Sequence, residues 1–264
     1  MISTSIIAAF AFYAILPALF VTAVLLVCRG RMKISVRNIA IGAAVFFLFS
    51  QVLEKFLHAY MLALNTSIAS WLKDHPYGYA LYACLAAGVF EEVGRYLAMR
   101  FVVKDTGNPG TAVGYGLGHG GIEAVLLGSM SLIATVVFAI MLKLGYEVKL
   151  SAMLGPEGLA QLKAALEYVP HGALLLSMLE RLIALLIQVG LSVLVWRAVQ
   201  TRRLALLAIA IAVHAAIDFP VGLVQAGQLS GTVVMGWLLL IGAAIAAWFL
   251  YRLPRKSTAL VASA

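Results

Sequence analysis

The sequence predicts an all-α, polytopic membrane protein with about seven transmembrane helices, and three observations support this prediction. First, 63% of the 264 residues are hydrophobic and 11% are charged, whereas soluble domains carry about 25% charged residues. Second, apolar stretches of about 20 residues or more recur along the chain, and each is long enough to cross the hydrocarbon core of a bilayer. Third, most Lys and Arg residues flank these stretches, where such residues determine membrane orientation.

We predict spans at residues 5–28, 38–64, 77–103, 112–142, 171–200, 204–225 and 231–252. Twelve Lys and Arg residues lie on the side where the first, third, fifth and seventh spans end, and four lie on the opposite side. The positive-inside rule therefore places the N-terminus outside and the C-terminus in the cytoplasm. Because topology accounts for the net charge of +8, we expect no nucleic-acid partner. Residues 1–264 are expected to form a single transmembrane domain.

The connection between the fourth and fifth spans is long enough to contain a helix of its own. It begins near Pro156, ends before Pro170, and places four apolar residues on one helical face: Leu159, Leu162, Leu166 and Val169. We predict a short helix that lies in the outer membrane interface.

The third span contains Glu91, Glu92 and Arg95 inside an otherwise apolar helix. A single charge at mid-bilayer costs at least about 2.5–3.5 kcal/mol on insertion scales, so these groups need partners or a water-filled cavity. On a helix, Arg95 is one turn from both carboxylates and can reach either of them. We predict that Arg95 holds one carboxylate while the other points elsewhere.

Two further spans each carry a histidine followed one helical turn later by an acid. These pairs are His119 with Glu123 and His214 with Asp218. Glycines surround His119, and they allow a neighbouring helix or a substrate backbone to approach closely. A packing seam with one buried hydrogen-bonded pair would explain the glycines, but it explains poorly why an acid is kept there.

The depths of these residues in their spans agree. At ~1.5 Å per residue, Glu91, Glu123 and His214 all lie roughly 15–18 Å from the predicted cytoplasmic ends of their helices. We therefore predict one shared cavity near the middle of the membrane.

A second set of polar residues lies mainly nearer the outer half of the second and fifth spans: Glu54, Lys55, His58, Glu180, Arg181 and Gln188. We predict that these residues mainly join helices, through ion pairs such as Glu54 with Arg181 or Glu180 with Lys55, or support the site from a distance.

Peptide-bond hydrolysis needs a water, a base that activates it, and donors for the oxyanion. Glu91 or Glu92 can serve as the base, and His119 or His214 can share the water or donate to the oxyanion. Glu, His and Asp in such pairs also hold divalent metals such as zinc. The candidate metal ligands are His119, Glu123, His214 and Asp218.

Three motifs on successive spans carry a resemblance to a known superfamily: Glu91-Glu92-x-x-Arg95, His119-x-x-x-Glu123 and His214-x-x-x-Asp218. They resemble the motif series of the intramembrane endopeptidases, which include the CAAX prenyl endopeptidases, the CPBP proteins, the PrsW proteases and the YhfC-like membrane proteins. The run at residues 118–124 and the pair Glu180-Arg181 are most similar to the YhfC-like branch. The resemblance covers residues 80–220, which we expect to be the motif-bearing core.

The resemblance implies that Glu91 is the catalytic glutamate and Arg95 its basic companion. It implies a second site at His119 with Glu123, and oxyanion stabilisation by His214 with Asp218. Two residues separate the double Glu from Arg95, where the prenyl enzymes have three, and the second site ends in Glu rather than His. These departures argue against a prenylated substrate.

We therefore predict a protein of the bacterial inner membrane, in contact with lipids, that cleaves a membrane-embedded or membrane-anchored peptide. Glu91 activates the water in this hypothesis, and the mechanism is either glutamate-type or dependent on a metal such as zinc. The alternative is a proton- or ion-coupled transporter in which the same acids and histidines form a relay. The chain lacks the duplication into two related halves that many transporters show.

Overall fold

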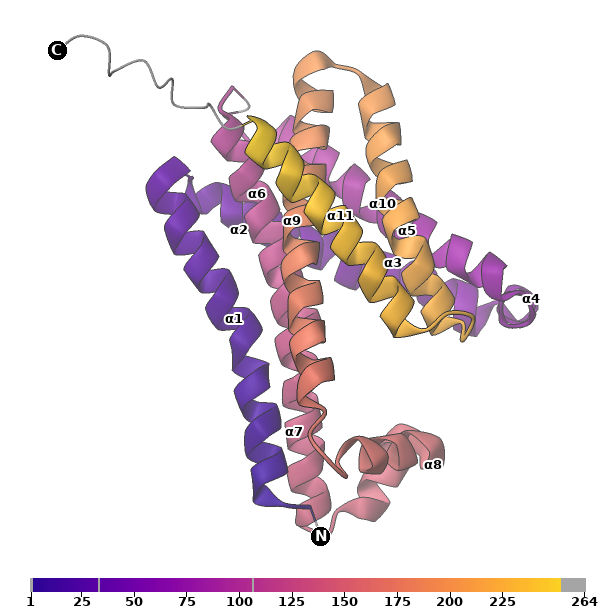
Figure 1. Cartoon of the computed structure of the whole chain (residues 1–264). Coiled ribbons are helices and arrows are strands. Elements are labelled where there is room, and N and C mark those ends of the chain that lie inside the picture. The colour runs from indigo at the N-terminus through magenta and orange to yellow at the C-terminus, as the bar shows by residue number, and fades with distance from the viewer. Residues whose placement is uncertain (1, 33, 106, 253–264) are drawn as a thin grey trace, which may run out of the picture.

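The computed structural model describes residues 2–32, 34–105 and 107–252, and all regular structure within them is helical. Figure 1 shows how the helices are arranged. Four elements, η1 to η4, are π-helical turns that continue or join α-helices. In chain order the elements are α1 (Thr4–Met32), α2 (Val36–Phe46), η1 (Phe47–Leu53), α3 (Glu54–Ala59), η2 (Tyr60–Leu64), α4 (Thr66–Asp74), α5 (Pro76–Leu97), η3 (Ala98–Val102), α6 (Pro109–Glu123), η4 (Ala124–Ser129), α7 (Met130–Lys143), α8 (Glu147–Ala165), α9 (His171–Thr201), α10 (Leu204–Gln225) and α11 (Gly231–Arg252).

Five helical segments are long and apolar enough to cross a membrane: Thr4–Gly30, Val36–Leu64, Pro109–Lys143, His171–Thr201 and Leu204–Gln225. They correspond to predicted spans 1, 2, 4, 5 and 6. The third predicted span is helical as α5 and η3, but its acidic and basic residues lower its hydropathy. The seventh is helical as α11. The all-helical membrane fold is thus confirmed, and the crossing of α5 and α11 stays a prediction.

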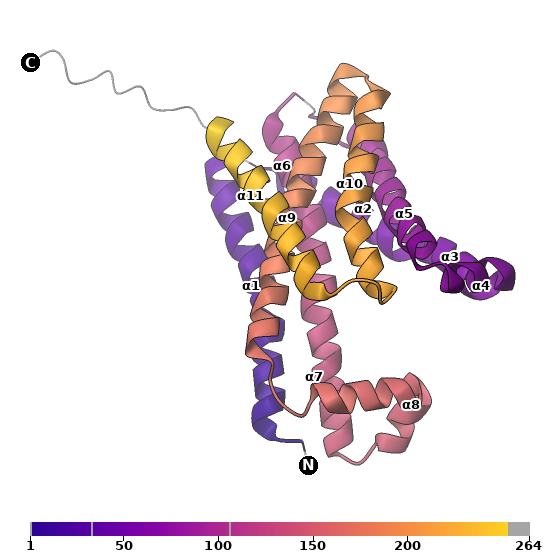
Figure 2. The same cartoon turned by 45° about the vertical axis from the view of Figure 1, so that its right-hand side comes forward.

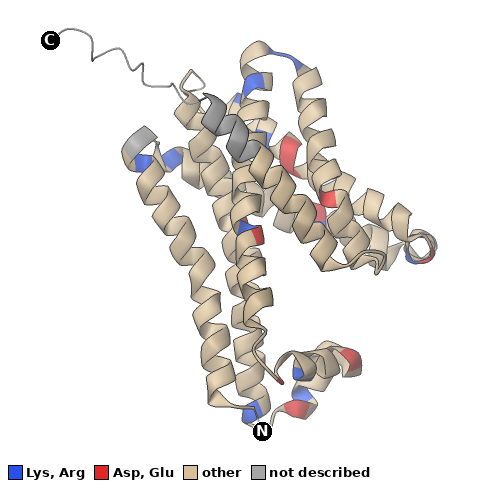
Figure 3. Cartoon of the chain, viewed as in Figure 1, with Lys and Arg blue, Asp and Glu red and all other residues tan. Residues whose placement is uncertain are grey.

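The two ends of the bundle carry most of the basic residues. In the ribbon of Figure 3, Lys and Arg positions lie near the end of α1 and at the turn between α9 and α10, and others lie at the opposite end around α7 and α8. Figure 1 places the N-terminal end of the chain at the end where α8 lies.

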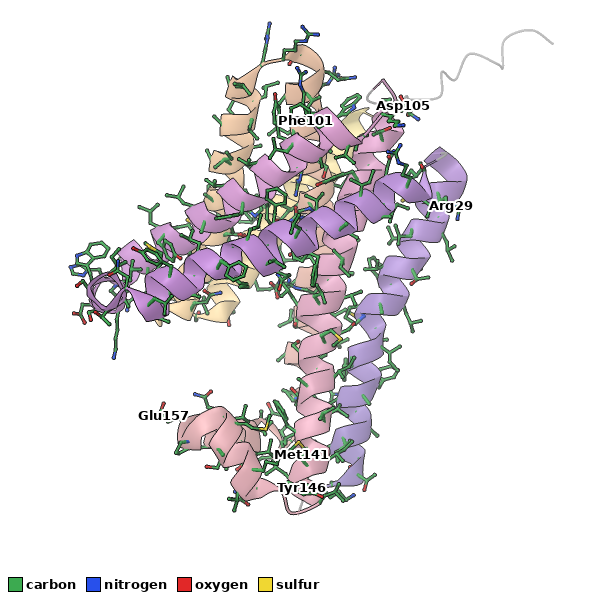
Figure 4. The ribbon with its side chains drawn as sticks, turned by 180° about the vertical axis from the view of Figure 1, so that it is seen from behind. Arg29, Phe101, Asp105, Met141, Tyr146 and Glu157 are labelled. Atoms are coloured by element: carbon green, nitrogen blue, oxygen red, sulfur yellow. The ribbon has the colours of Figure 1, made fainter. Side chains whose placement is uncertain are left out.

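Helix α9 lies at the centre of the bundle, where it packs against α5, α6, α10 and α11. The largest cluster of buried apolar side chains forms around it and includes Met99, Tyr115, Val195 and Trp196. The segment from α2 to η2 crosses the other helices obliquely and packs against α6 and α5 (Figure 4). This arrangement brings α5, α6, α9 and α10 together around the polar residues of the predicted site.

Glycines on α6 allow two helices to approach it closely. A Cβ atom at Gly118 would lie 1.9 Å from the carbonyl oxygen of Ile39 on α2, and one at Gly120 would lie 2.9 Å from Cβ of Gln188 on α9. Only glycine tolerates such a close backbone approach. The predicted role of these glycines in helix packing is confirmed, and His119 between them is fully buried.

The predicted helix between the fourth and fifth spans is present as part of α8. Gly155 has a φ of 73°, which bends α8 just before Pro156. The helix turns Leu159 toward the core, and Leu166, which follows α8, is also buried. Helix α8 packs against α7 at one end of the bundle, away from the other helices (Figure 2).

Candidate active site

A cavity of about 530 Å³ opens among the helices that carry the sequence motifs. Its walls come from η1 and α3 on one side and from α5, α9 and α10 on the others, with Glu123 at the end of α6. Glu91, Glu123, His214 and Asp218 all line it. The shared cavity predicted from equal depth is therefore confirmed.

Arg95 holds Glu92. Arg95 Nη1 lies 3.4 Å from Glu92 Oε2, and both side chains are fully buried. The other carboxylate oxygen, Glu92 Oε1, lies 2.7 Å from His214 Nδ1. Glu92 therefore faces Arg95 through an ion pair at Oε2 and hydrogen-bonds to His214 through Oε1, and it is a structural anchor for both residues.

Glu91 is the carboxylate of the double Glu that Arg95 does not hold. Its Oε2 atom lies 2.9 Å from His119 Nε2 and 4.0 Å from His214 Nε2. Unlike Glu92, Glu91 lines the cavity. The sequence left open which of the two carboxylates Arg95 would hold, and the structure assigns that role to Glu92.

Gln188 on α9 connects these groups to Glu123. Its Nε2 donates to Glu91 Oε2 at 3.1 Å and to Glu123 Oε2 at 2.8 Å, while its Oε1 accepts from Arg95 Nη2. The sequence analysis grouped Gln188 with the second polar set, and this was wrong. Gln188 lies about 12 residues, or roughly 18 Å, before the predicted end of its span, which is the depth of Glu91. The depth count that located the other residues would have found it.

His214 and Asp218 form the expected pair on α10. His214 Nε2 lies 3.3 Å from Asp218 Oδ2, and the Asp218 side chain is 37% exposed. A close approach of α5 and α10 at Gly88, where a Cβ atom would lie 3.0 Å from the Ile211 carbonyl oxygen, brings His214 against the double Glu. We call the assembled residues the core cluster: Glu91, Glu92, Arg95, His119, Glu123, Gln188, His214 and Asp218.

A second cluster lines another part of the same cavity and comprises Glu54, His58, Tyr82, Glu180 and Arg181. His58 Nε2 lies 3.0 Å from Glu54 Oε1, and His58 Nδ1 lies 2.7 Å from Tyr82 Oη. Arg181 contacts Glu180 and lies 3.6 Å from Glu123 Oε1.

The predicted ion pairs of this second set were wrong. Within the described ranges, Glu54 pairs with His58 rather than with Arg181, and Glu180 contacts Arg181 rather than Lys55. Both observed contacts are between residues on the same helix. Arg181 also reaches Glu123, so the second cluster is connected to the core cluster.

Three side chains of the core cluster have the donor set of a metal site. One ligand atom each from Glu91, His119 and Glu123 lies within 4.8 Å of the other two. His119 Nε2 faces both Glu91 Oε2 and, at 3.3 Å, Arg95 Nη2, so a single ring nitrogen meets an acceptor and a donor together. Nitrogen and oxygen ligands of this kind are typical of zinc. These three residues therefore fit a divalent ion. The group contains two of the four predicted metal ligands, His119 and Glu123, together with Glu91, which was not predicted as a ligand.

Comparisons with known proteins identify the family of the chain. The model of a family described as "YhfC intramembrane metalloprotease" matches residues 12–239. The "Uncharacterized membrane protein YhfC" of Bacillus subtilis (strain 168) is 34% identical over 222 residues, which cover 84% of this chain and 86% of that protein. No solved structure matches the chain. The chain belongs to the YhfC intramembrane metalloprotease family.

Proposed function

We propose that this protein is an intramembrane endopeptidase that hydrolyses a peptide bond of a membrane-embedded or membrane-anchored peptide. One observation carries the proposal: Glu91 and Glu123 line a cavity of about 530 Å³ within apolar helices, and the buried His119 converges on both of them. The cavity gives room for a peptide segment and water, and the converging groups supply what hydrolysis needs. The family description supports the same class of reaction.

Glu91, His119 and Glu123 are the residues that would hold a divalent ion such as zinc. When bound, such an ion polarises the scissile carbonyl group and makes water more acidic. His119 is fixed for this purpose by its burial between the glycines of α6.

In the proposed reaction Glu91 takes a proton from the attacking water and gives it to the amine nitrogen as the peptide C–N bond breaks, because Glu91 is the carboxylate of the double Glu that borders the cavity. Glu92 has no access to the cavity and keeps Arg95 and His214 in place. His214 Nε2 donates to the developing oxyanion from the cavity wall. If Glu91 instead held the ion, Asp218, which also lines the cavity and contacts His214, would take the proton.

The test uses the purified full chain with a library of membrane-anchored peptides, and mass spectrometry identifies the products. We expect defined cleavage products from the wild type, and a parallel chelator titration with zinc add-back separates a metal-dependent mechanism from a glutamate-type one. Cleavage lost in chelator and restored by zinc assigns the reaction to the metal-dependent mechanism. Proton or ion transport without any proteolytic product would overturn the proposal in favour of the transporter.

We also propose that all seven predicted spans cross the plasma membrane of a bacterial cell, with the N-terminus outside. The distribution of Lys and Arg supports this topology, and the membrane protein from B. subtilis supports a bacterial membrane as the location. Reporter fusions after Val103 and Arg203 should behave as cytoplasmic, and fusions near Asp74 and Gly158 as external. An external signal at Arg203 would contradict the seven-span topology.

A further inference from the structure

Gln188 is the uncharged side chain at the centre of the core cluster, and it is 5% exposed. Its backbone carbonyl accepts from Arg95 Nη1 at 3.2 Å, and its Oε1 accepts from Arg95 Nη2. Its Nε2 donates to Glu91 at 3.1 Å and to Glu123 at 2.8 Å. Both ends of the amide are therefore used, one toward a cation and one toward two carboxylates.

The chemistry of Arg95 determines the direction of this amide. A guanidinium has donors only, so the amide oxygen of Gln188 must face Arg95. The NH₂ group then faces the opposite way, toward Glu91 and Glu123. Helix α9 is also in close contact with α6 at Gly120, where a Cβ atom would lie 2.9 Å from Gln188 Cβ, and this contact restricts movement of the side chain.

Glu91 and Glu123 come from different helices, α5 and α6, and two ionised carboxylates repel each other at short range. The NH₂ group of Gln188 offsets this repulsion by donating to both. We propose that Gln188 is a positioning residue that holds Glu91 and Glu123 within reach of one divalent ion, an inference that rests on the proposed function of the core cluster. Nothing in the chemistry of Gln188 requires it to touch the substrate.

The first test is Gln188→Glu in the full-length protein. This change keeps the side-chain length and an oxygen toward Arg95, but it replaces the NH₂ group by an oxygen that faces two carboxylates. We expect the Tm in chelator to fall by about 5 °C or more and to recover when Zn²⁺ or Co²⁺ is added. The matched control is Ser192→Ala, one turn along α9, which removes a hydroxyl that donates to the backbone carbonyl of Gln188. Its Tm should show no added dependence on the cation.

The second test measures Co²⁺ binding from the visible absorption of the ion. Gln188→Asn keeps the carbonyl and the NH₂ group of the carboxamide but shortens the side chain. The carboxamide then cannot reach Arg95 and both carboxylates at once. We expect Co²⁺ affinity to fall by about 10–100-fold, as it does when groups that orient metal ligands are changed. This variant keeps the inference testable if Gln188→Glu does not fold.

Neither measurement needs a substrate, so the inference and the proposed function can fail separately. Co²⁺ affinity unchanged in Gln188→Asn would overturn the role of Gln188 even if the wild type cleaves peptides. A wild type that binds no Co²⁺ would also overturn it. If Gln188→Asn binds Co²⁺ more weakly than the wild type and the wild type cleaves no peptide, the result supports Gln188 as a positioning residue and rejects the protease function.

Discussion

The core cluster and the second cluster line one cavity, but they are assembled in different ways. In the core cluster, contacts such as Glu91 with His119 and Arg95 with Gln188 join residues on separate helices, α5 with α6 and α5 with α9. In the second cluster, Glu54 with His58 and Arg181 with Glu180 are contacts within one helix. The first arrangement depends on the packing of four helices. In the second cluster these two contacts form within single helices, and two others, His58 with Tyr82 and Arg181 with Glu123, join separate helices.

This difference predicts how strongly a substitution in each cluster affects the protein. Core residues such as Arg95 and His119 are fully buried, so a group that loses its partner there cannot be rehydrated without moving a helix. The Arg181 and Glu180 side chains are 15% and 26% exposed and can recruit water from the cavity. Substitutions should therefore have larger effects in the core cluster, and the following predictions test this ranking in descending order.

The largest effect is expected for Glu91→Gln, which keeps the shape of the side chain and removes its basicity. Cleavage should fall by about 10²–10⁴-fold, the usual contribution of a general base, while the Tm stays close to that of the wild type. Peptide cleavage and thermal unfolding of the same preparations measure both quantities. Glu157→Gln on exposed α8 is the matched control and should change neither. Full cleavage by Glu91→Gln would remove Glu91 from the reaction.

The next effect separates the two adjacent glutamates. Glu92→Gln removes the carboxylate that pairs with Arg95 and faces His214 Nδ1, and breaking a buried ion pair costs about 3–5 kcal/mol. We expect a lower free energy of unfolding in denaturant titrations and a smaller loss of cleavage per folded molecule than in Glu91→Gln. A Glu92→Gln variant that is as stable as the wild type but inactive would exchange the roles of the two residues.

A smaller effect is expected at the junction of the clusters. Arg181→Ala removes the partner of Glu123 and Glu180, both of which border the cavity, and should lower the free energy of unfolding by about 1–3 kcal/mol. The matched control is Arg203→Ala at the exposed turn before α10, where a change within about 0.5 kcal/mol is expected. If Arg181→Ala is as stable as the control yet inactive, Arg181 belongs to the reaction and the ranking fails.

The sequence predicted much of the core cluster because its motifs use spacing within one helix. His119 with Glu123 and His214 with Asp218 follow from a separation of one helical turn, and equal depth predicted that they share a cavity. The structure confirms the shared cavity, and it adds Gln188, a residue that carries no charge and belongs to no motif. An amide inside a membrane helix is a weak signal in isolation, so only its depth could have identified it.

The partners of the second cluster were not predictable from the same reasoning, and Glu54 shows why. The π-helical turn η1 (Phe47–Leu53) directly precedes Glu54 and changes the number of residues per turn. The face of the helix that Glu54 occupies therefore does not follow from a period of 3.6 residues. In addition, α2 to η2 crosses the bundle obliquely, so residues at equal depth in two spans need not be neighbours.

The smallest effect is expected for Tyr82→Phe. This change deletes the hydroxyl that lies 2.7 Å from His58 Nδ1, while His58 keeps its contact with Glu54. The free energy of unfolding should fall by about 0.5–1.5 kcal/mol, the usual net contribution of one hydrogen bond. Tyr77→Phe on the same helix is the matched control, because the Tyr77 side chain is exposed and its hydroxyl can bond to water. Cleavage per folded molecule should match the wild type in both variants. A loss of cleavage as large as that of Glu91→Gln would show that the hydrogen-bonded residues Glu54, His58 and Tyr82 take part in the reaction. The two clusters would then form a single active site.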